Sequence, residues 1–162
     1  MNRRAEFSQI VAAGGIFLVG ALVYLFDRSG SDIYFIPEWW TLADGTPTLF
    51  GALGRSLPSF AHTFCFILLT SALLTPWQIP PLKICLAWCG TEALLESGQA
   101  DPFATRIVDM LPAWLADWPI LQNVPGYFSR GAFDLADLAA IGLGGVAAWC
   151  TIVLTNSIGV ND

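Results

Sequence analysis

Charged residues are scarce in this chain of 162 residues, and their scarcity excludes several classes of protein. Only 12% of the residues are charged, about half of what a soluble domain carries. The net charge is −6, which gives no electrostatic basis for binding nucleic acid. The apolar residues, 55% of the chain, gather in long runs, and the mean hydropathy is +0.60. These features predict a single all-α membrane domain, spanning residues 1–162, rather than a soluble enzyme.

Recognisable catalytic and metal-binding motifs are also absent. The chain has one histidine and lacks H-E-x-x-H, G-x-S-x-G and the P-loop. Its four cysteines lie inside apolar runs, so they predict no disulfide framework. Cys85 and Cys89 are one helical turn apart, but no His or third Cys lies near them in sequence to complete a metal site. We therefore expect no metal and no cofactor.

Four apolar segments are predicted to cross the membrane as helices. They are residues 9–26, 58–75, 82–98 and 132–155. The first has 18 residues without a charge, too many for the core of a signal peptide, so we expect it to stay as an anchor. A proline-rich link makes the second and third an antiparallel pair. The prediction is a bundle of four transmembrane helices with aromatic-rich interfacial outer loops at 27–57 and 99–131.

The placement of Lys and Arg predicts the orientation of this bundle. With the N-terminus inside, the short inner segments carry Arg3, Arg4 and Lys83. The two long outer loops carry the other four basic residues among seven acidic ones. Basic residues are therefore denser inside, and both termini are expected to face the cytoplasm.

Both outer loops are rich in tryptophan. Trp39 and Trp40 lie in the first loop, and Trp114 and Trp118 lie in the second. Tryptophan prefers the headgroup level of a bilayer, so these loops are expected to rest on membrane lipids. A protein partner would cover the same residues equally well.

Small residues recur at every fourth position of the last predicted span. They are Ala132, Ala136, Ala140, Gly144 and Ala148. This spacing lets two membrane helices approach closely, so we expect a packing face here, either inside the bundle or against another membrane subunit.

Ionisable residues from three predicted helices fall at one depth, just beneath the outer surface. At about 1.5 Å per residue, His62, Glu92 and Asp137 lie roughly 6–10 Å below it. A carboxylate facing lipid at mid-membrane costs about 2.5–3.5 kcal/mol on insertion scales, so these groups should turn toward one another. The result would be a polar pocket that opens outward. Its predicted residues are His62, Glu92, Glu96, Gln99, Arg130, Asp134 and Asp137.

Two of these acids also have simpler explanations. Asp134 is expected in the first turn of its helix, where capping alone would account for a carboxylate. Glu96 lies near enough to the surface to reach water. Glu92, Asp137 and His62 are harder to explain without a pocket.

Three short motifs resemble the VanZ-like family of small bacterial membrane proteins. They are residues 57–66 (LPSFAHTFCF), 96–99 (ESGQ) and 130–145 (RGAFDLADLAAIGLGG). The family shows a His, then E-x-x-Q, then an Arg and a D-x-x-x-N-x-x-G-type helix. This chain departs from it where Ala140 and Ile141 replace the Asn, and its loop between Gln99 and Arg130 is longer. The resemblance implies a bacterial inner-membrane location and a link to teicoplanin resistance, but no reaction.

Three functions stay open at this point. The first is a VanZ-like envelope protein whose pocket binds a lipid headgroup, a cell-wall precursor or a lipophilic glycopeptide. The second is an accessory subunit of a larger membrane complex. The third is an intramembrane enzyme, in which Asp134 and Asp137 act as acid and base, or join Glu92 and Glu96 in holding a hard cation such as Mg²⁺. The absence of catalytic motifs makes the enzyme the less favoured of the three.

Overall fold

The computed structural model describes residues 3–28, 42 and 49–158, and most of these residues are helical. No strand occurs within those ranges. The long helices are α1 (Arg3–Phe26), α2 (Leu53–Leu74), α3 (Pro81–Ser97) and α6 (Leu135–Ile158). Shorter elements connect them: η3 (Thr75–Trp77), α4 (Phe103–Met110), η4 (Ala113–Asp117), η5 (Leu121–Asn123) and α5 (Val124–Arg130).

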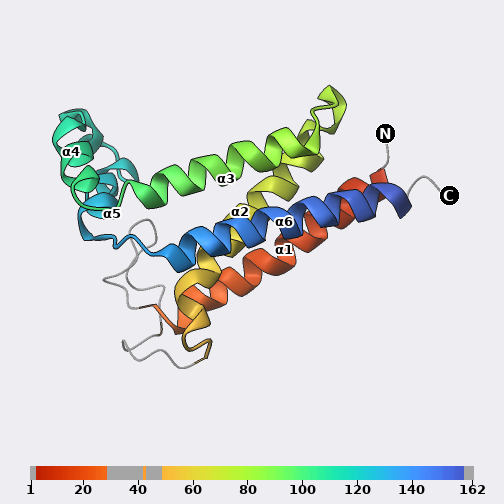
Figure 1. Cartoon of the computed structure of the whole chain (residues 1–162), viewed down its shortest axis with the longest axis horizontal. Coiled ribbons are helices and arrows are strands. Elements are labelled where there is room, and N and C mark those ends of the chain that lie inside the picture. Colours follow the sequence, from red (N-terminus) through yellow and green to blue (C-terminus); the bar gives the residue numbers. More distant parts are fainter. Residues whose placement is uncertain (1–2, 29–41, 43–48, 159–162) are drawn as a thin grey trace.

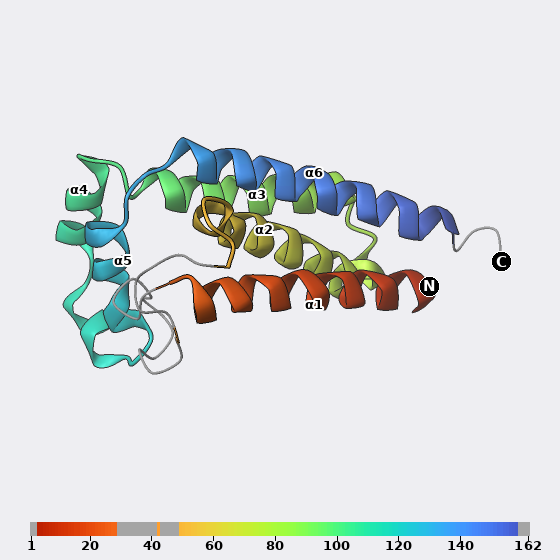
Figure 2. The same cartoon turned by 90° about the horizontal axis from the view of Figure 1, so that it is seen from below.

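The four long helices lie alongside one another with alternating direction (Figures 1 and 2). Helix α2 is central and packs against α1, α3 and α6, and α3 also packs against α6. The α4–α5 segment lies at one end of the bundle, where α1 ends and α2 begins. The start of α1, the end of α6 and the α2–α3 connection share the opposite end.

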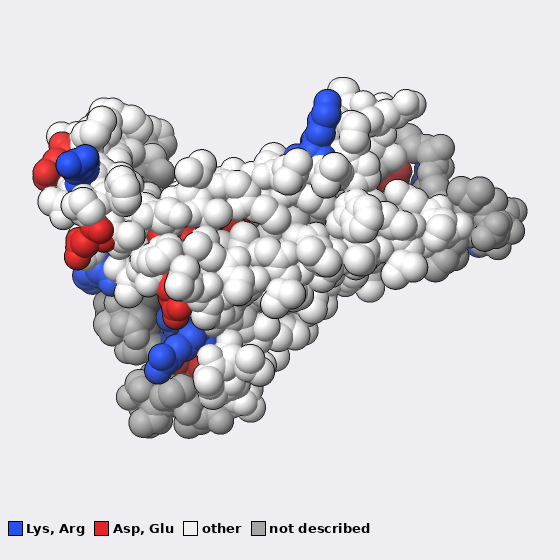
Figure 3. All heavy atoms as spheres, in the orientation of Figure 1, with Lys and Arg blue, Asp and Glu red and all other residues white. Residues whose placement is uncertain are grey.

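Three helices are long and apolar enough to cross a membrane, so the fold is that of an all-helical membrane protein. They are Arg3–Phe26, Leu53–Trp77 and Leu135–Ser157. The fourth predicted span, α3, is a helix of 17 residues and about 25 Å, shorter than a hydrocarbon core of about 30 Å. Charged side chains lie mainly toward the two ends of the molecule, with a largely uncharged band between them (Figure 3).

The centre of the bundle is a close contact between α2 and α6. Ile67, Leu68 and Ile152 are almost fully buried there. A Cβ placed on Gly144 would lie 2.8 Å from the carbonyl oxygen of Phe60, so only glycine permits this approach. The core therefore depends on a backbone-to-backbone fit as well as on apolar burial.

Part of the predicted small-residue stripe takes part in this packing. Ala140, Gly144 and Ala148 are buried. Ala132 precedes the helix and Ala136 is exposed, so the packing face is shorter than predicted. Towards its start, α6 lines a cavity together with α2.

The predicted outer loops also differ from the structure. Helix α2 begins at Leu53, five residues before the predicted span. The predicted loop 99–131 consists largely of the four short helices α4, η4, η5 and α5. Its Trp114 and Trp118 are 55% and 60% exposed. Trp39 and Trp40 lie outside the described residues.

Candidate functional site

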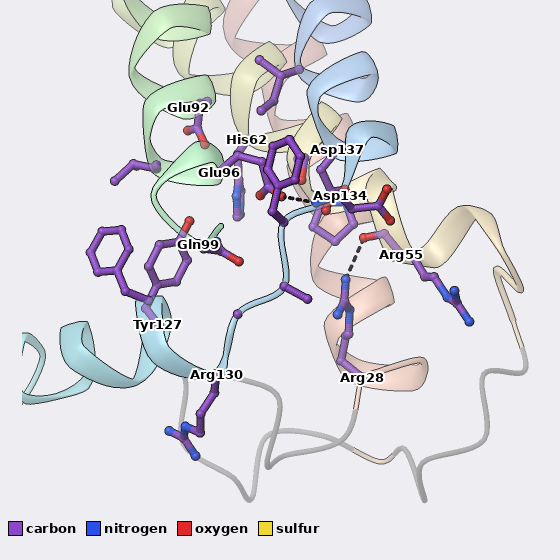
Figure 4. A pocket seen from close by; sticks show the side chains of 18 of the residues that line it. Arg28, Arg55, His62, Glu92, Glu96, Gln99, Tyr127, Arg130, Asp134 and Asp137 are labelled. Carbon is purple, nitrogen blue, oxygen red and sulfur yellow. Dashed lines mark hydrogen bonds between the residues drawn. The ribbon is translucent and has the colours of Figure 1, made fainter. Parts of the chain in front are cut away.

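A cavity of about 910 Å³ lies at the α4–α5 end of the bundle, and we call it the end cavity. Helices α1, α2, α3, α5 and α6 all contribute to its wall (Figure 4). It is lined by every residue that the sequence places in a pocket: His62, Glu92, Glu96, Gln99, Arg130, Asp134 and Asp137. Residues far apart in the chain therefore meet around one space.

Asp134 caps the start of α6. Its carboxylate Oδ1 accepts the backbone N–H of Ala136 at 2.8 Å, and its carbonyl accepts the N–H of Asp137 at 3.1 Å. A carboxylate at this position satisfies an unpaired helix N–H and faces the positive end of the helix dipole. Asp134 precedes α6 instead of lying in its first turn as expected. Capping still accounts for a carboxylate at this position.

Glu96 ties α3 to the same helix start. Its Oε1 accepts the backbone N–H of Asp134 at 2.8 Å, as drawn in Figure 4. The side chain is only 7% exposed, so it does not reach out to water as the simpler sequence explanation supposed. In a capping box, the acid three residues after the cap would make this bond. Here that acid is Asp137, and Glu96 from another helix has taken its role.

Asp137 is consequently left to face the end cavity. Its Oδ1 is buried, and it has no hydrogen-bond partner among the residues that the structure describes. Glu92 also lines the cavity, from α3. We call Glu92 and Asp137 the acidic pair. A buried acceptor without a partner costs about 1–3 kcal/mol, so such a position is expected to receive a donor.

His62 lines the same cavity and is stacked against two aromatic rings. Its ring centroid is 6.2 Å from that of Tyr24 on α1 and 5.9 Å from that of Phe66 on α2. Both neighbours are stacked, with interplanar angles of 21° and 22°. This packing fixes the imidazole in the cavity wall.

Arginines lie at the side of the end cavity where α1 ends and α2 begins. Arg28 Nη2 donates to the carbonyl oxygen of Arg55 at 2.7 Å, which joins the two helix ends (Figure 4). Arg130 also lines the cavity, but Figure 4 shows its guanidinium turned away from the acids. Arg130 is thus part of the lining, as predicted, with its guanidinium directed away from the acids.

Gln99 and Tyr127 form the wall on the α5 side. A Cβ on Gly131 would overlap the amide of Gln99, so glycine leaves the room in which this amide sits. Burial raises the pKa of Tyr127 to about 12, although its hydrogen bond with Gln99 acts in the opposite direction. Tyr127 thus presents a neutral phenol at ordinary pH.

Among the lining residues that sequence reasoning missed are two arginines and two tyrosines: Arg28, Arg55, Tyr24 and Tyr127. A signal for the arginines exists, because Arg28 lies two residues after the apolar run at 9–26 and Arg55 lies three residues before the run at 58–75. Both were assigned to a loop. The tyrosines carried no charge to mark them.

The end cavity combines several kinds of polar side chain in one lining. Acids and an imidazole lie on one side of it, arginines lie on another, and a phenol and an amide lie between them. Within the described part of the chain, no group of three or more His, Cys, Asp or Glu side chains is arranged to hold a metal ion.

The fold and the cavity together define an all-helical membrane protein with a charged internal site. Comparison of the chain with models of protein families, with curated proteins and with solved structures finds no match. The residues of the end cavity are therefore the basis on which a function can be proposed.

Proposed function

We propose that this chain is an integral membrane protein of four transmembrane helices whose end cavity binds the polar head group of a membrane-embedded ligand. Helices α1, α2 and α6 meet the requirements for crossing a membrane. For α3, support comes from its packing against α2 and α6 and from Glu92 and Glu96, which line the cavity instead of adding charge to a lipid-facing surface.

The observation that carries the proposal is the convergence of seven polar residues around one cavity of about 910 Å³. Ligand pockets typically measure about 300–1,000 Å³ and combine apolar walls with a few polar groups. Ionisable residues inside a membrane protein are costly and tend to mark functional sites. A purely structural role accounts for Asp134 and Glu96, which cap α6, but not for the acidic pair.

We further propose that the end cavity faces outward from a bacterial inner membrane, with both termini in the cytoplasm. The higher density of Lys and Arg in the short inner segments than in the long outer loops supports this orientation. Exposed Phe103, Trp114 and Trp118 beside the cavity suit the headgroup level of the outer leaflet. Membership of the VanZ-like family is part of this proposal, supported by the motif residues His62, Glu96 and Gln99 in the cavity wall.

Mass spectrometry of the intact protein, extracted in mild detergent, tests this function. The wild-type protein is expected to retain bound lipid, and the double variant Glu92→Gln/Asp137→Asn is expected to lose it. The matched control is Asp109→Asn/Asp117→Asn, which removes two exposed acids outside the cavity. Equal retention by both variants, with helical content unchanged, would refute a binding role. A stoichiometric companion protein would instead favour an accessory subunit.

A further inference from the structure

Charges of both signs line the end cavity. Arg55 precedes His62 by seven residues on α2, a distance of about 10 Å along the helix. His62 stacks on Tyr24, whose electrostatic neighbours are Arg28 and both members of the acidic pair. We call the part of the lining at Arg28 and Arg55 the arginine side and the part at Glu92 and Asp137 the acidic side.

The acidic side calls for a hydrogen-bond donor that is also positively charged. Asp137 Oδ1 is buried without a partner in the described structure, and Glu92 lines the same cavity from α3. A hydroxyl group would satisfy one acceptor but leave two carboxylates uncompensated. A primary ammonium group supplies three N–H donors and one positive charge, so it fits both requirements.

The arginine side suits an anion. Arg28 is held in place by the carbonyl of Arg55, so its guanidinium is positioned in advance of any ligand. Guanidinium groups bind phosphate well because their N–H donors are rigidly spaced. A phosphate on this side and an ammonium on the other would complement the two sides of the cavity.

The acidic pair lies where α3 and α6 border the end cavity. Helices α3 and α6 touch at Cys89 and Gly145 and are tied again by Glu96 and Asp134. The acidic pair lies between those two contacts along the chain. Figure 3 shows acidic atoms at the bottom of a narrow gap between α3 and α6. Exposed Leu95, Phe133 and Leu135 near this gap suit the acyl chains of a lipid.

We infer that the ligand of the end cavity is a phospholipid with a primary ammonium in its head group, of the phosphatidylethanolamine type, which enters between α3 and α6. Its ammonium binds the acidic pair, and its phosphate faces Arg28. This inference rests on the proposed function, because it specifies the ligand class of the same site. No covalent step is involved.

Competition between defined lipids tests the ligand class on the wild-type protein. Delipidated full-length protein is offered equal amounts of phosphatidylethanolamine, phosphatidylcholine and phosphatidylglycerol with identical acyl chains, and the bound lipids are counted by mass spectrometry. The ethanolamine lipid is expected to bind at least about tenfold more tightly than the other two, equivalent to about 1.4 kcal/mol. Equal binding of all three lipids would overturn the inference without any variant.

Two variants locate the preference in the acidic pair. Glu92→Gln and Asp137→Asn are each expected to reduce the preference for the ethanolamine lipid over the glycerol lipid by about tenfold. Asp109→Asn, outside the cavity, is expected to leave it unchanged. Thermal unfolding followed by circular dichroism identifies any variant that has lost its fold. If a variant has lost its fold, the lipid competition on the wild-type protein alone tests the inference.

A displacement experiment with a water-soluble compound distinguishes a membrane lipid from a free solute that has the same head group. Glycerophosphoethanolamine, which has the head group but no acyl chains, is added to protein loaded with the ethanolamine lipid. It is expected not to displace the lipid, because the chains contribute binding along α3 and α6. Displacement at equal concentration would show that the ligand is a solute and would overturn the lipid assignment.

The outcomes distinguish failure of this inference from failure of the proposed function. If the acidic-pair variants lose all three lipids equally, the cavity binds head groups but does not select an ammonium, and only the inference is wrong. If those variants keep all lipids with unchanged affinities, the end cavity is not a head-group site and both are wrong.

Discussion

A methyl group added at Gly144 is expected to destabilise the bundle, whereas the same change two residues earlier is not. The new Cβ at Gly144 would lie 2.8 Å from the Phe60 carbonyl oxygen and 3.3 Å from the Thr63 Cβ. The nearest obstacle is backbone, which has no rotamer to change, so α2 and α6 must move apart. Overpacking of this kind costs about 1–3 kcal/mol.

Gly142 provides the matched control. A Cβ there meets nothing within 4 Å, so Gly142→Ala brings only the higher helix propensity of alanine, about 1 kcal/mol in favour of the folded state. Gly144→Ala gains the same propensity, so the free energies of unfolding of the two variants should differ by the overpacking cost alone, about 1–3 kcal/mol. Gly142→Ala is expected to be the more stable of the two.

The assay is unfolding in mixed micelles, in which the fraction of a denaturing detergent is raised while helicity is followed by circular dichroism. Both variants carry the same atoms in the same helix, so differences in insertion or detergent binding largely cancel. If Gly144→Ala is as stable as Gly142→Ala, the close approach of α2 and α6 is wrong, and so is the position of α6 beside the end cavity.

Three further predictions concern the residues around the cavity. Glu96→Leu removes the acceptor of the Asp134 N–H and should lower the free energy of unfolding by about 1–3 kcal/mol. Glu96→Gln keeps an acceptor, so its free energy of unfolding should fall by less. The same micelle titration measures both variants. Burial raises the pKa of Tyr127 from 10.0 to about 12, so its phenolate absorbance, measured as wild type minus Tyr127→Phe, should appear near pH 12. The free energy of unfolding should fall as the pH rises from about 10 to about 12, because the unfolded chain loses this proton first. A phenolate absorbance already present near pH 10 would contradict the burial of this phenol. Gly131→Ala should displace the Gln99 amide and weaken lipid retention, whereas Gly90→Ala, in open space, should not.

Much of the fold follows from the sequence because long apolar runs have few alternatives to a helix in a membrane. Helices α1, α2 and α6 correspond to three of the predicted spans. Membrane crossing by α3 is a different matter, since Glu92 and Glu96 lower its hydropathy and its length is short. It stays a prediction, as does the orientation of the bundle.

The sequence predicts a site residue only where its depth along a helix determines whether it reaches the cavity. His62, Glu92 and Asp137 follow from counting residues along three helices, and they do line one cavity. Arg28 and Arg55 do not follow, because their positions depend on the turns at the helix ends. The bond from Asp134 to Glu96 crosses 38 residues of chain, and no local pattern marks it. Whether the end cavity binds a ligand stays a prediction.

The bond between Glu96 and the start of α6 has a consequence for biogenesis. Translation produces the acids of α3 well before Leu135 emerges, so a nascent chain inserted up to that point holds Glu92 and Glu96 without the helix that completes their surroundings. Arrival of α6 supplies the N–H of Asp134 and closes the wall. A chain truncated before α6 should therefore be a preferred substrate for membrane proteases, because its unsatisfied carboxylates remain in a half-built bundle.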